Sequence, residues 1–193
     1  MIIVVAQALL IFMDESSVVV NSYPSGSHDG DNNSVENNNM MKVNLSVYYG
    51  SLCQPCSIFI VKNLQEIFYN GLIDIINLQL VPWANAYINK DTNNSIICQN
   101  GPDECELNSV ESCAINILNT VDKTYALIQC FQLLAIEKRP KNWDECFSRL
   151  ALPKDLIVNC HNTGNGTQEY ENFTSYVCNS YGGSSMPEAC MDH

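Results

Sequence analysis

Basic residues are scarce in this sequence, and no stretch gathers them into a patch. The 193 residues contain nine Lys and Arg against 21 Asp and Glu, so the formal net charge is −12. Nucleic acids and anionic membrane surfaces attract proteins through clustered positive charge. We therefore expect no nucleic-acid partner and no binding to an anionic membrane.

Histidine is also rare, and its few occurrences do not accompany the cysteines in a metal-binding pattern. All three histidines fall in segments that we interpret as loops or tails: His28, His161 and His193. Zinc modules use closely spaced Cys or His pairs, whereas the cysteines from 98 to 113 are seven and eight residues apart. The sequence also lacks a glycine-rich phosphate loop. We expect no metal and no cofactor.

The chain has no hydrophobic run long enough to cross a bilayer. The run from Ile2 to Met13 is shorter than the roughly 20 residues that a transmembrane helix needs. Its length suits a signal peptide, although it lacks basic residues before the apolar stretch. We interpret residues 1–20 as signal peptide-like, the Ser-, Gly- and Asn-rich residues 21–40 as a disordered leader, and residues 41–193 as the folded domain.

Cysteine, by contrast, is abundant, with ten residues in the chain. Such a density in a secreted protein indicates disulfide bridges, and Asn-x-Ser/Thr sequons point to the same secretory route. Asn44 also begins a sequon but lies in a predicted core strand, where a glycan would not fit. The glycosylation sites that we predict are Asn32, Asn93, Asn165 and Asn172.

Two of the cysteines form the motif Cys53-Gln54-Pro55-Cys56, between a predicted strand, 43–49, and a predicted helix, 57–70. At the start of a helix the unpaired N–H groups and the helix dipole favour a thiolate, which is the attacking species in disulfide exchange. Cys53 is the candidate nucleophile, and Cys56, one turn later, is the candidate resolving thiol. The alternatives are a structural disulfide or half of a zinc site.

The pattern around this motif predicts an α/β fold. Leu72 to Val81 is a second β-rich run, so strand, helix and strand form a right-handed βαβ unit, which is the opening of a thioredoxin-like fold. Residues 98–160 are predicted to be an inserted, disulfide-stabilised helical region. Glu169 to Ser180 has the pattern of a final amphipathic helix.

The second informative motif begins at Cys98 and has the form Cys-Gln-x-Gly-x-x-Glu-Cys-x-x-Asn-x-x-x-x-Cys. With the CxxC upstream of it, this pattern resembles the signature of the gamma-interferon-inducible lysosomal thiol reductases. The resemblance covers about Val43 to Cys190. It implies a glycosylated enzyme of the endocytic and secretory system that reduces protein disulfides at acidic pH.

By this resemblance, Cys53 and Cys56 are the active-site pair, and the other cysteines are structural. Eight cysteines allow four bridges in 105 connectivities. On a helix Cys105 and Cys113 lie about two turns apart, so we expect each to bond to another element. The predicted structural cysteines are Cys98, Cys105, Cys113, Cys130, Cys146, Cys160, Cys178 and Cys190.

The chain departs from the family pattern in two places. Asn100 stands where the signature usually has a histidine. Between Cys160 and Glu169 only eight residues replace a segment in which the family has a strand hairpin that begins after a cis-proline. Two strands of about five residues each do not fit there. We therefore expect an incomplete sheet with an exposed apolar edge.

These observations leave two hypotheses of different classes. The first is a thiol–disulfide oxidoreductase that acts on disulfide-containing proteins, draws electrons from a small-thiol or protein donor, and works in a lysosomal or vacuolar compartment or outside the cell. The alternative is a catalytically impaired, disulfide-stabilised secreted glycoprotein derived from this fold. The intact CxxC favours the first, and the missing hairpin favours the second.

Overall fold

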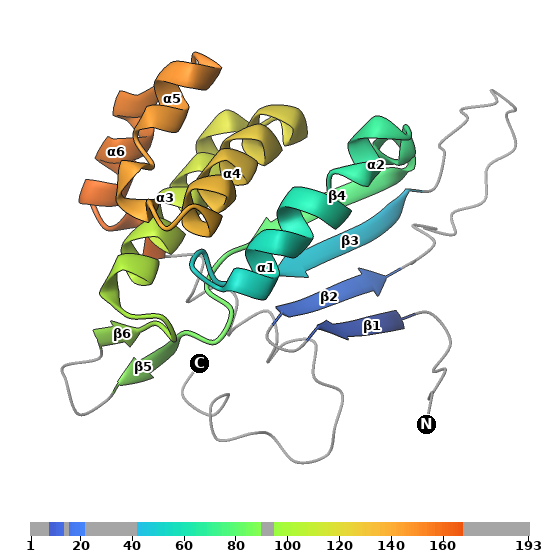
Figure 1. The fold of residues 1–193 in the computed structure, drawn as a ribbon, viewed down its shortest axis with the longest axis horizontal. Coiled ribbons are helices and arrows are strands. Elements are labelled where there is room, and N and C mark those ends of the chain that lie inside the picture. Colours follow the sequence, from blue (N-terminus) through green and yellow to red (C-terminus); the bar gives the residue numbers. More distant parts are fainter. Residues whose placement is uncertain (1–7, 14–15, 22–41, 90–94, 168–193) are drawn as a thin grey trace, which may run out of the picture.

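The computed structural model describes residues 8–13, 16–21, 42–89 and 95–167. Within these residues a sheet carries helices α1 (Gln54–Ile58) and α2 (Glu66–Tyr69) on one face, and a group of longer helices lies to one side of it (Figure 1). The mixture of strands and helices fits the predicted α/β class with a disulfide-stabilised helical region.

The main sheet has four strands in the order β1-β2-β3-β4. β1 pairs antiparallel with β2, β2 pairs antiparallel with β3, and β3 pairs parallel with β4. A second, two-stranded sheet joins β5 and β6. The strands are β1 (Ala8–Met13), β2 (Ser16–Asn21), β3 (Val43–Tyr48), β4 (Ile76–Val81), β5 (Tyr87–Asn89) and β6 (Ser95–Ile97).

The sheet has more strands than expected, and its edge does not lie at β3, the strand that leads to the CxxC; within the described residues β4 ends the strand order on that side. β2 pairs with β3, and Val18 lies opposite Val47. The physical reason is that the free edge of β3 offers unpaired N–H and C=O groups, and the extended residues 16–21 satisfy them. The signal-peptide interpretation of residues 1–20 stays a prediction. The predicted leader lies outside the described residues, except that Asn21 ends β2.

The helical run after the CxxC differs in detail from the predicted helix 57–70. It begins earlier, as α1 (Gln54–Ile58), continues as a π-helical turn over Phe59–Asn63, and ends as α2 (Glu66–Tyr69). Gly71 then turns the chain with a φ of 77°, which glycine adopts without a steric penalty.

The strand predicted from Leu72 to Val81 is correct only in its second part. Leu72–Ile75 form a 3₁₀ helix, and β4 begins at Ile76. Leu72–Ile75 come immediately after the left-handed turn at Gly71. In these residues the chain makes one more tight turn, and only then does it run parallel to β3.

The helical region follows the prediction for residues 98–160. Its helices are α3 (Pro102–Leu118), α4 (Val121–Ile136), α5 (Glu145–Leu150) and α6 (Lys154–Asn162), with 3₁₀ turns at Pro140–Asn142 and Asn165–Thr167. Residues 161–167 contain no strand, as expected where the family has its hairpin. The predicted helix 169–180 lies outside the described residues.

Helix α4 links two hydrophobic cores. Phe131 belongs to a cluster among the helices, whereas Ile128 belongs to a cluster between the sheet and α1. The second cluster contains Val47 of β3 together with both cysteines of the CxxC. Burial of apolar side chains on both sides of α4 therefore holds the helical region against the CxxC. No helix in the described part of the chain is long and apolar enough to cross a membrane.

Candidate active site

Cys53 and Cys56 form a disulfide at the junction between β3 and α1. The S–S distance is 2.02 Å and the Cα–Cα distance is 5.2 Å. Cys53 caps the N-terminus of α1, and its Sγ accepts a hydrogen bond of 3.3 Å from the backbone N–H of Cys56. Pro55 occupies the first turn, where a missing N–H costs nothing. The strand-turn-helix context predicted for the motif is therefore present.

The two sulfur-bearing residues are both largely buried. Cys53 is 3% exposed and Cys56 is fully buried at 0%. Of the pair, Cys53 thus retains the greater access to solvent. The roles of attacking and resolving thiol stay predictions, because an attacking thiol must meet its substrate and the exposure of both residues is small.

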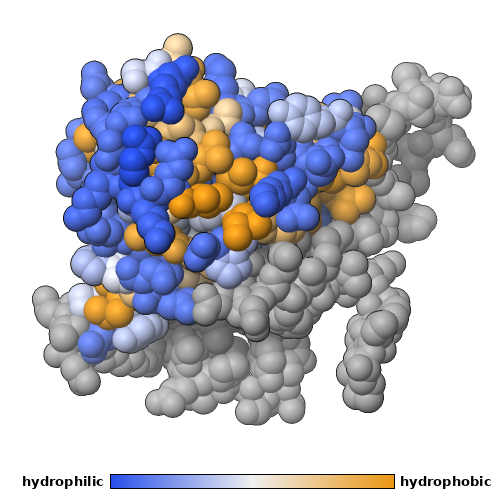
Figure 2. Space-filling model, viewed as in Figure 1, coloured by the Kyte–Doolittle hydropathy of each residue, from blue (hydrophilic) through white to orange (hydrophobic). Residues whose placement is uncertain are grey.

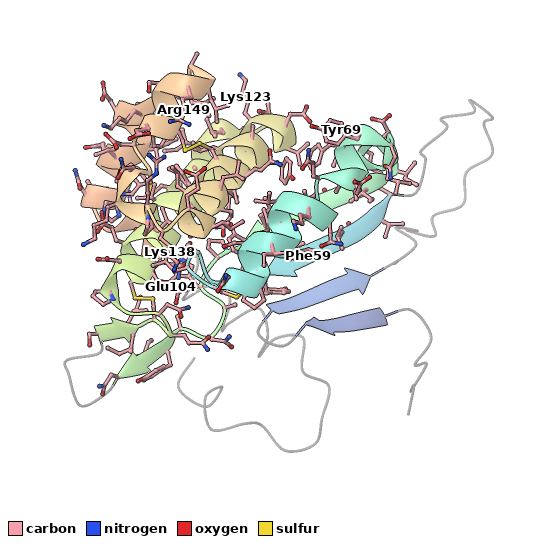
Figure 3. All side chains as sticks on the ribbon, in the orientation of Figure 1. Phe59, Tyr69, Glu104, Lys123, Lys138 and Arg149 are labelled. Atoms are coloured by element: carbon pink, nitrogen blue, oxygen red, sulfur yellow. A yellow bond between two sulfur atoms is a disulfide. The ribbon has the colours of Figure 1, made fainter. Side chains whose placement is uncertain are left out.

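Two polar residues of the Cys98 signature hold the loop that precedes Cys53. Asn108 Oδ1 accepts a hydrogen bond of 2.9 Å from Ser51 N, and it also accepts one from the Ser51 hydroxyl. Glu104 Oε2 accepts a bond of 3.1 Å from Leu52 N. These bonds fix the loop to α3, and Figure 3 shows Glu104 near the end of α3 that faces this loop. The signature residues therefore position the CxxC.

Gly50 allows the close approach that these bonds require. A Cβ atom on Gly50 would lie 2.8 Å from Glu104 Oε2. That spacing is shorter than a van der Waals contact, so any side chain here would displace the Glu104 carboxylate. Glycine at this position therefore belongs to the anchoring of the loop.

Asn100, which replaces the usual histidine of the signature, also contacts Glu104. Its backbone N–H donates to Glu104 Oε1 at 3.0 Å, and its side-chain Nδ2 donates to Oε2 at 2.8 Å. The substitution thus leaves a hydrogen-bond donor on the glutamate that holds the loop. Asparagine does not titrate, whereas the imidazole of a histidine at this position could titrate near neutral pH.

A chain of polar side chains lies behind the disulfide. Ser57 Oγ lies 3.1 Å from Cys53 O and 2.6 Å from Gln132 Oε1. Gln132 Nε2 donates to Glu111 Oε1 at 3.1 Å. Ser57, Gln132 and Glu111 are all buried. The chain links the backbone of Cys53 to a carboxyl group in the middle of α3.

Glu111 is a titratable group held away from water. Burial raises its pKa from 4.5 to about 8, although hydrogen bonds from Tyr49, Ser51 and Gln132 lower it and the charge of Glu104 raises it further. Its Oε2 atom lacks a well-formed hydrogen bond within the described part of the chain. Both observations fit a carboxyl group that stays protonated at acidic and neutral pH.

Sequence reasoning missed this polar chain. Glu111 and Gln132 are ordinary helix residues in the sequence, and only their burial makes them unusual. The polar residues of the Cys98 signature were visible as a pattern, but their contacts with residues 51 and 52 depend on how α3 packs against the loop. A polar residue on the apolar face of a helix is the one signal that points to such a site.

Six of the predicted structural cysteines form three further disulfides. One lies beside the N-terminus of α3, one joins α3 to α6, and one joins α4 to α5. Cys105 and Cys113 are bonded to other partners and not to each other. The pairs are Cys98–Cys105, Cys113–Cys160 and Cys130–Cys146. Cys178 and Cys190 lie outside the described residues.

The remaining predicted positions are only partly covered by the structure. Asn165 is exposed at the start of a 3₁₀ turn whose next residue, Gly166, is buried, and its glycosylation stays a prediction. The interpretation of His161 as a loop residue is wrong, because it lies in α6 and its Nδ1 is 2.9 Å from Ser109 Oγ of α3. In the described ranges, no three His, Cys, Asp or Glu side chains gather as a metal site. The positions outside these ranges are His28, Asn32, Asn93, Asn172 and His193.

Comparisons with known proteins identify relatives of this chain. The sequence model of the gamma interferon inducible lysosomal thiol reductase (GILT) family matches residues 44–150. A gamma-interferon-responsive lysosomal thiol protein of Arabidopsis thaliana is 36% identical over 121 residues, which are 63% of this chain and 48% of that protein.

Two animal proteins named gamma-interferon-inducible lysosomal thiol reductase are also similar. The one from Carassius auratus is 40% identical over 95 residues, covering 49% of this chain and 37% of that protein. The one from Mus musculus is 30% identical over 129 residues, covering 65% of this chain and 50% of that protein. The chain spans half or less of the length of these relatives. Because the family model matches more than half of the chain, including the CxxC and the Cys98 signature, the protein belongs to the gamma-interferon-inducible lysosomal thiol reductase family.

Proposed function

We propose that the protein is a thiol reductase that reduces disulfide bonds in protein substrates through Cys53 and Cys56. The observation that carries this proposal is the bonded pair at the strand-to-helix junction, in a chain of a family named for thiol reductases. The backbone N–H of Cys56 that points at Cys53 Sγ supports the assignment, because the same bond stabilises a thiolate at Cys53.

The reaction starts from the dithiol form of the pair. The Cys53 thiolate attacks one sulfur of a substrate disulfide, forms a mixed disulfide, and releases the other substrate sulfur as a thiolate that takes up a proton. Cys56 then loses its proton and attacks Cys53 Sγ. This step releases the second substrate thiol and forms the Cys53–Cys56 disulfide, so two electrons have passed to the substrate.

The structure contains the oxidised form that ends this cycle. Two electrons and two protons must then come from a donor, which we propose to be a small thiol or a protein dithiol that undergoes the same exchange in reverse. Both sulfur atoms lie within the same turn of the chain, so regeneration needs no large movement of the backbone.

An acidic endolysosomal or secretory compartment suits this chemistry. The three further disulfides within the described residues would persist in an oxidising compartment and not in a reducing cytosol. Relatives from fish and mouse carry the word lysosomal in their names. Both points support the proposal that the protein is sorted through the secretory pathway.

Exposed apolar side chains near the CxxC support unfolded polypeptides as substrates. Ile58 of α1 is 40% exposed, and Leu133 and Ile136 of α4 are 43% and 38% exposed. Hydrophobic surface is visible over the region where α1 and α4 lie side by side (Figures 1 and 2). Unfolded chains present apolar segments that such a surface can bind.

A reductase assay with a denatured disulfide-containing protein tests the proposal. Wild type should be active, Cys53→Ser should lose all activity, and Cys56→Ser should accumulate mixed disulfides because the intermediate is not resolved. Glu106→Gln, an exposed change on α3, is the matched control and should retain activity. Equal activity of Cys53→Ser and wild type would exclude the proposed role of Cys53.

The second candidate is a disulfide-stabilised glycoprotein without efficient catalysis. The small exposure of Cys53 and the lack of a strand in residues 161–167 favour it. In that case the purified protein would be folded and would carry its bridges, yet it would show no Cys53-dependent turnover. Circular dichroism and a count of free thiols beside the assay distinguish this outcome from misfolding.

A further inference from the structure

The polar chain behind the CxxC contains a group that the proposed reaction does not use. Glu111, on α3, is fully buried and reaches Gln132 of α4. Gln132 in turn reaches Ser57, whose hydroxyl lies 3.1 Å from the carbonyl oxygen of Cys53. A carboxyl group is thus joined to the backbone of the candidate nucleophile through two side chains.

The hydrogen bonds that join Glu111 to the backbone of Cys53 can point in either of two directions along the series of side chains. The Ser57 hydroxyl has one hydrogen, so it donates either to Cys53 O or to Gln132 Oε1. If Glu111 is ionised, Gln132 donates to it through Nε2 and accepts from Ser57 through Oε1. If Glu111 is protonated, the side-chain amide of Gln132 can rotate so that its oxygen and nitrogen exchange places, and the Glu111 O–H can then donate to the amide oxygen. Ser57, now accepting from the amide nitrogen, then donates to Cys53 O.

We propose that Glu111 is a positioning residue for the thiol chemistry. In its protonated form it supports a neutral hydrogen-bond chain that ends on Cys53, and its ionisation reverses this chain and opposes thiolate formation at the CxxC. The inference rests on the proposed reductase function for its biological meaning. Its physical core, the coupling of one carboxyl to two thiols, does not depend on turnover.

Among the described residues, no positive charge acts on Glu111 to favour its ionisation. In the part of the chain that the structure describes, the charge that acts on it is that of Glu104, on the same helix, which raises the pKa of Glu111. The loop after β3 contributes the hydroxyls of Tyr49 and Ser51, and α4 contributes the neutral Gln132. From α6, His161 contacts Ser109, two residues before Glu111.

A negative charge in this environment would act strongly on the sulfur atoms. Both cysteines are buried in the same cluster as Tyr49, where the electrostatic interaction is weakly screened. A thiolate and an ionised carboxyl that lie close together repel each other. Whichever of the two groups ionises second therefore has a raised pKa. The reductase should therefore work best where Glu111 is protonated, and its activity should fall as pH rises through about 8.

Glu111→Gln isolates this effect, because glutamine keeps the size of the side chain and imitates the protonated carboxyl. After selective reduction of the CxxC, thiolate absorbance is titrated against pH in wild type, Glu111→Gln and the surface control Glu106→Gln. The last thiol to ionise should do so at lower pH in Glu111→Gln. A shift of one unit would mean about tenfold more thiolate at a given pH. Glu106→Gln should match wild type.

The pH profile of kcat/KM gives the second readout. Wild type should lose activity on the alkaline side, whereas Glu111→Gln should keep it there and should match wild type at about pH 5. A merely structural role for Glu111 would change stability without moving either profile. Superimposed titration curves for wild type and Glu111→Gln would overturn the inference, and so would a folded Glu111→Gln that is inactive at acidic pH.

Wild type alone provides a test that needs no folded variant. By reciprocity, the Glu111 carboxyl should titrate at higher pH in the dithiol form than in the disulfide form, because a thiolate opposes its ionisation. Carboxyl ¹³C NMR measures this, and identical titrations in the two forms would contradict the coupling. If wild type lacks Cys53-dependent turnover while the titrations differ, the proposed function fails and the coupling stands.

Discussion

Single buried polar residues decide how the CxxC is held. Asn108 and Glu104 hold the loop that leads to Cys53, and Glu111 lies at the end of the polar chain behind it. All three belong to α3, a helix that the sequence presents as a signature for cysteine bridges. At this scale the sequence showed which residues recur in a pattern, but it could not show that their side chains point at the CxxC loop.

The stability of the protein should fall with rising pH because of Glu111. The folded state has a pKa of about 8 at this group against 4.5 for the ordinary carboxyl, so folding takes up a proton between these values. The contribution of Glu111 is fully present below 4.5, declines as pH rises and is lost above about 8. Its limiting slope is about 1.4 kcal/mol per pH unit.

Urea unfolding at about pH 5 and about pH 8 measures this dependence. Glu111→Gln should lose less stability than wild type over the same interval, because the amide does not titrate. The comparison removes the contributions of all other groups, which the two proteins share. The same pH dependence in both proteins would show that Glu111 ionises as readily as an exposed glutamate.

Replacing Asn108 by Ala should destabilise the loop before Cys53. The change leaves the buried Ser51 N–H without its partner, which costs about 1–3 kcal/mol in the free energy of unfolding. Asn159→Ala, an exposed change on α6, is the matched control. Chemical denaturation measures both, and a cost for Asn108→Ala no larger than that of the control would show that the bond does not anchor the loop.

At the scale of elements, short sequence patterns predicted the strand and the helix start that flank the CxxC. A β-rich run, the CxxC with its proline, and Asn70-Gly71 placed the strand, the helix start and the helix end. The π turn at Phe59–Asn63 and the 3₁₀ helix before β4 were not predicted. Both turns depend on how the chain packs against the sheet and α4, and short sequence patterns do not contain this information.

The disulfides should contribute unequally to the helical region. The Cys113–Cys160 bond closes a sequence separation of 47, against 16 for Cys130–Cys146. In the chain-entropy account, the longer loop restricts the unfolded state more, and each bond is worth about 3–4 kcal/mol.

Removal of each bridge by paired Cys→Ala changes tests this order. The variant without Cys113–Cys160 should unfold at lower denaturant concentration than the one without Cys130–Cys146. Unfolding is followed without reductant, so that the remaining bridges stay intact. The reverse order would mean that local packing, and not chain entropy, dominates the contribution of these bridges.

At the scale of the whole molecule, the N-terminal hairpin of β1 and β2 extends the sheet beside β3. β1 and β2 lie beside β3, the strand that leads to Cys53. The sequence did not predict this arrangement, because residues 8–21 are apolar enough to read as a leader and their pairing with residues 44–48 is non-local. The lack of a strand in residues 161–167 was predicted, but the segment that pairs with β3 was not.

Val18→Pro should uncover the edge of β3. β2 lies between β1 and β3 and is hydrogen-bonded to both. Proline removes one backbone N–H from β2, so the sheet loses a hydrogen bond whichever neighbour that N–H faces. Val18→Thr keeps the N–H and is the control. Amide hydrogen exchange of β3 should speed up in Val18→Pro alone; unchanged protection would show that β2 does not protect this strand.

The claim that joins these scales is that Cys53 attacks substrate disulfides and Cys56 resolves the product. Incubation of Cys56→Ser with a disulfide-containing protein, followed by alkylation and mass spectrometry of non-reduced peptides, tests it most directly. The account predicts a mixed disulfide on Cys53 that disappears in the Cys53→Ser, Cys56→Ser double variant. An adduct on another cysteine, or none from a folded protein, would contradict it.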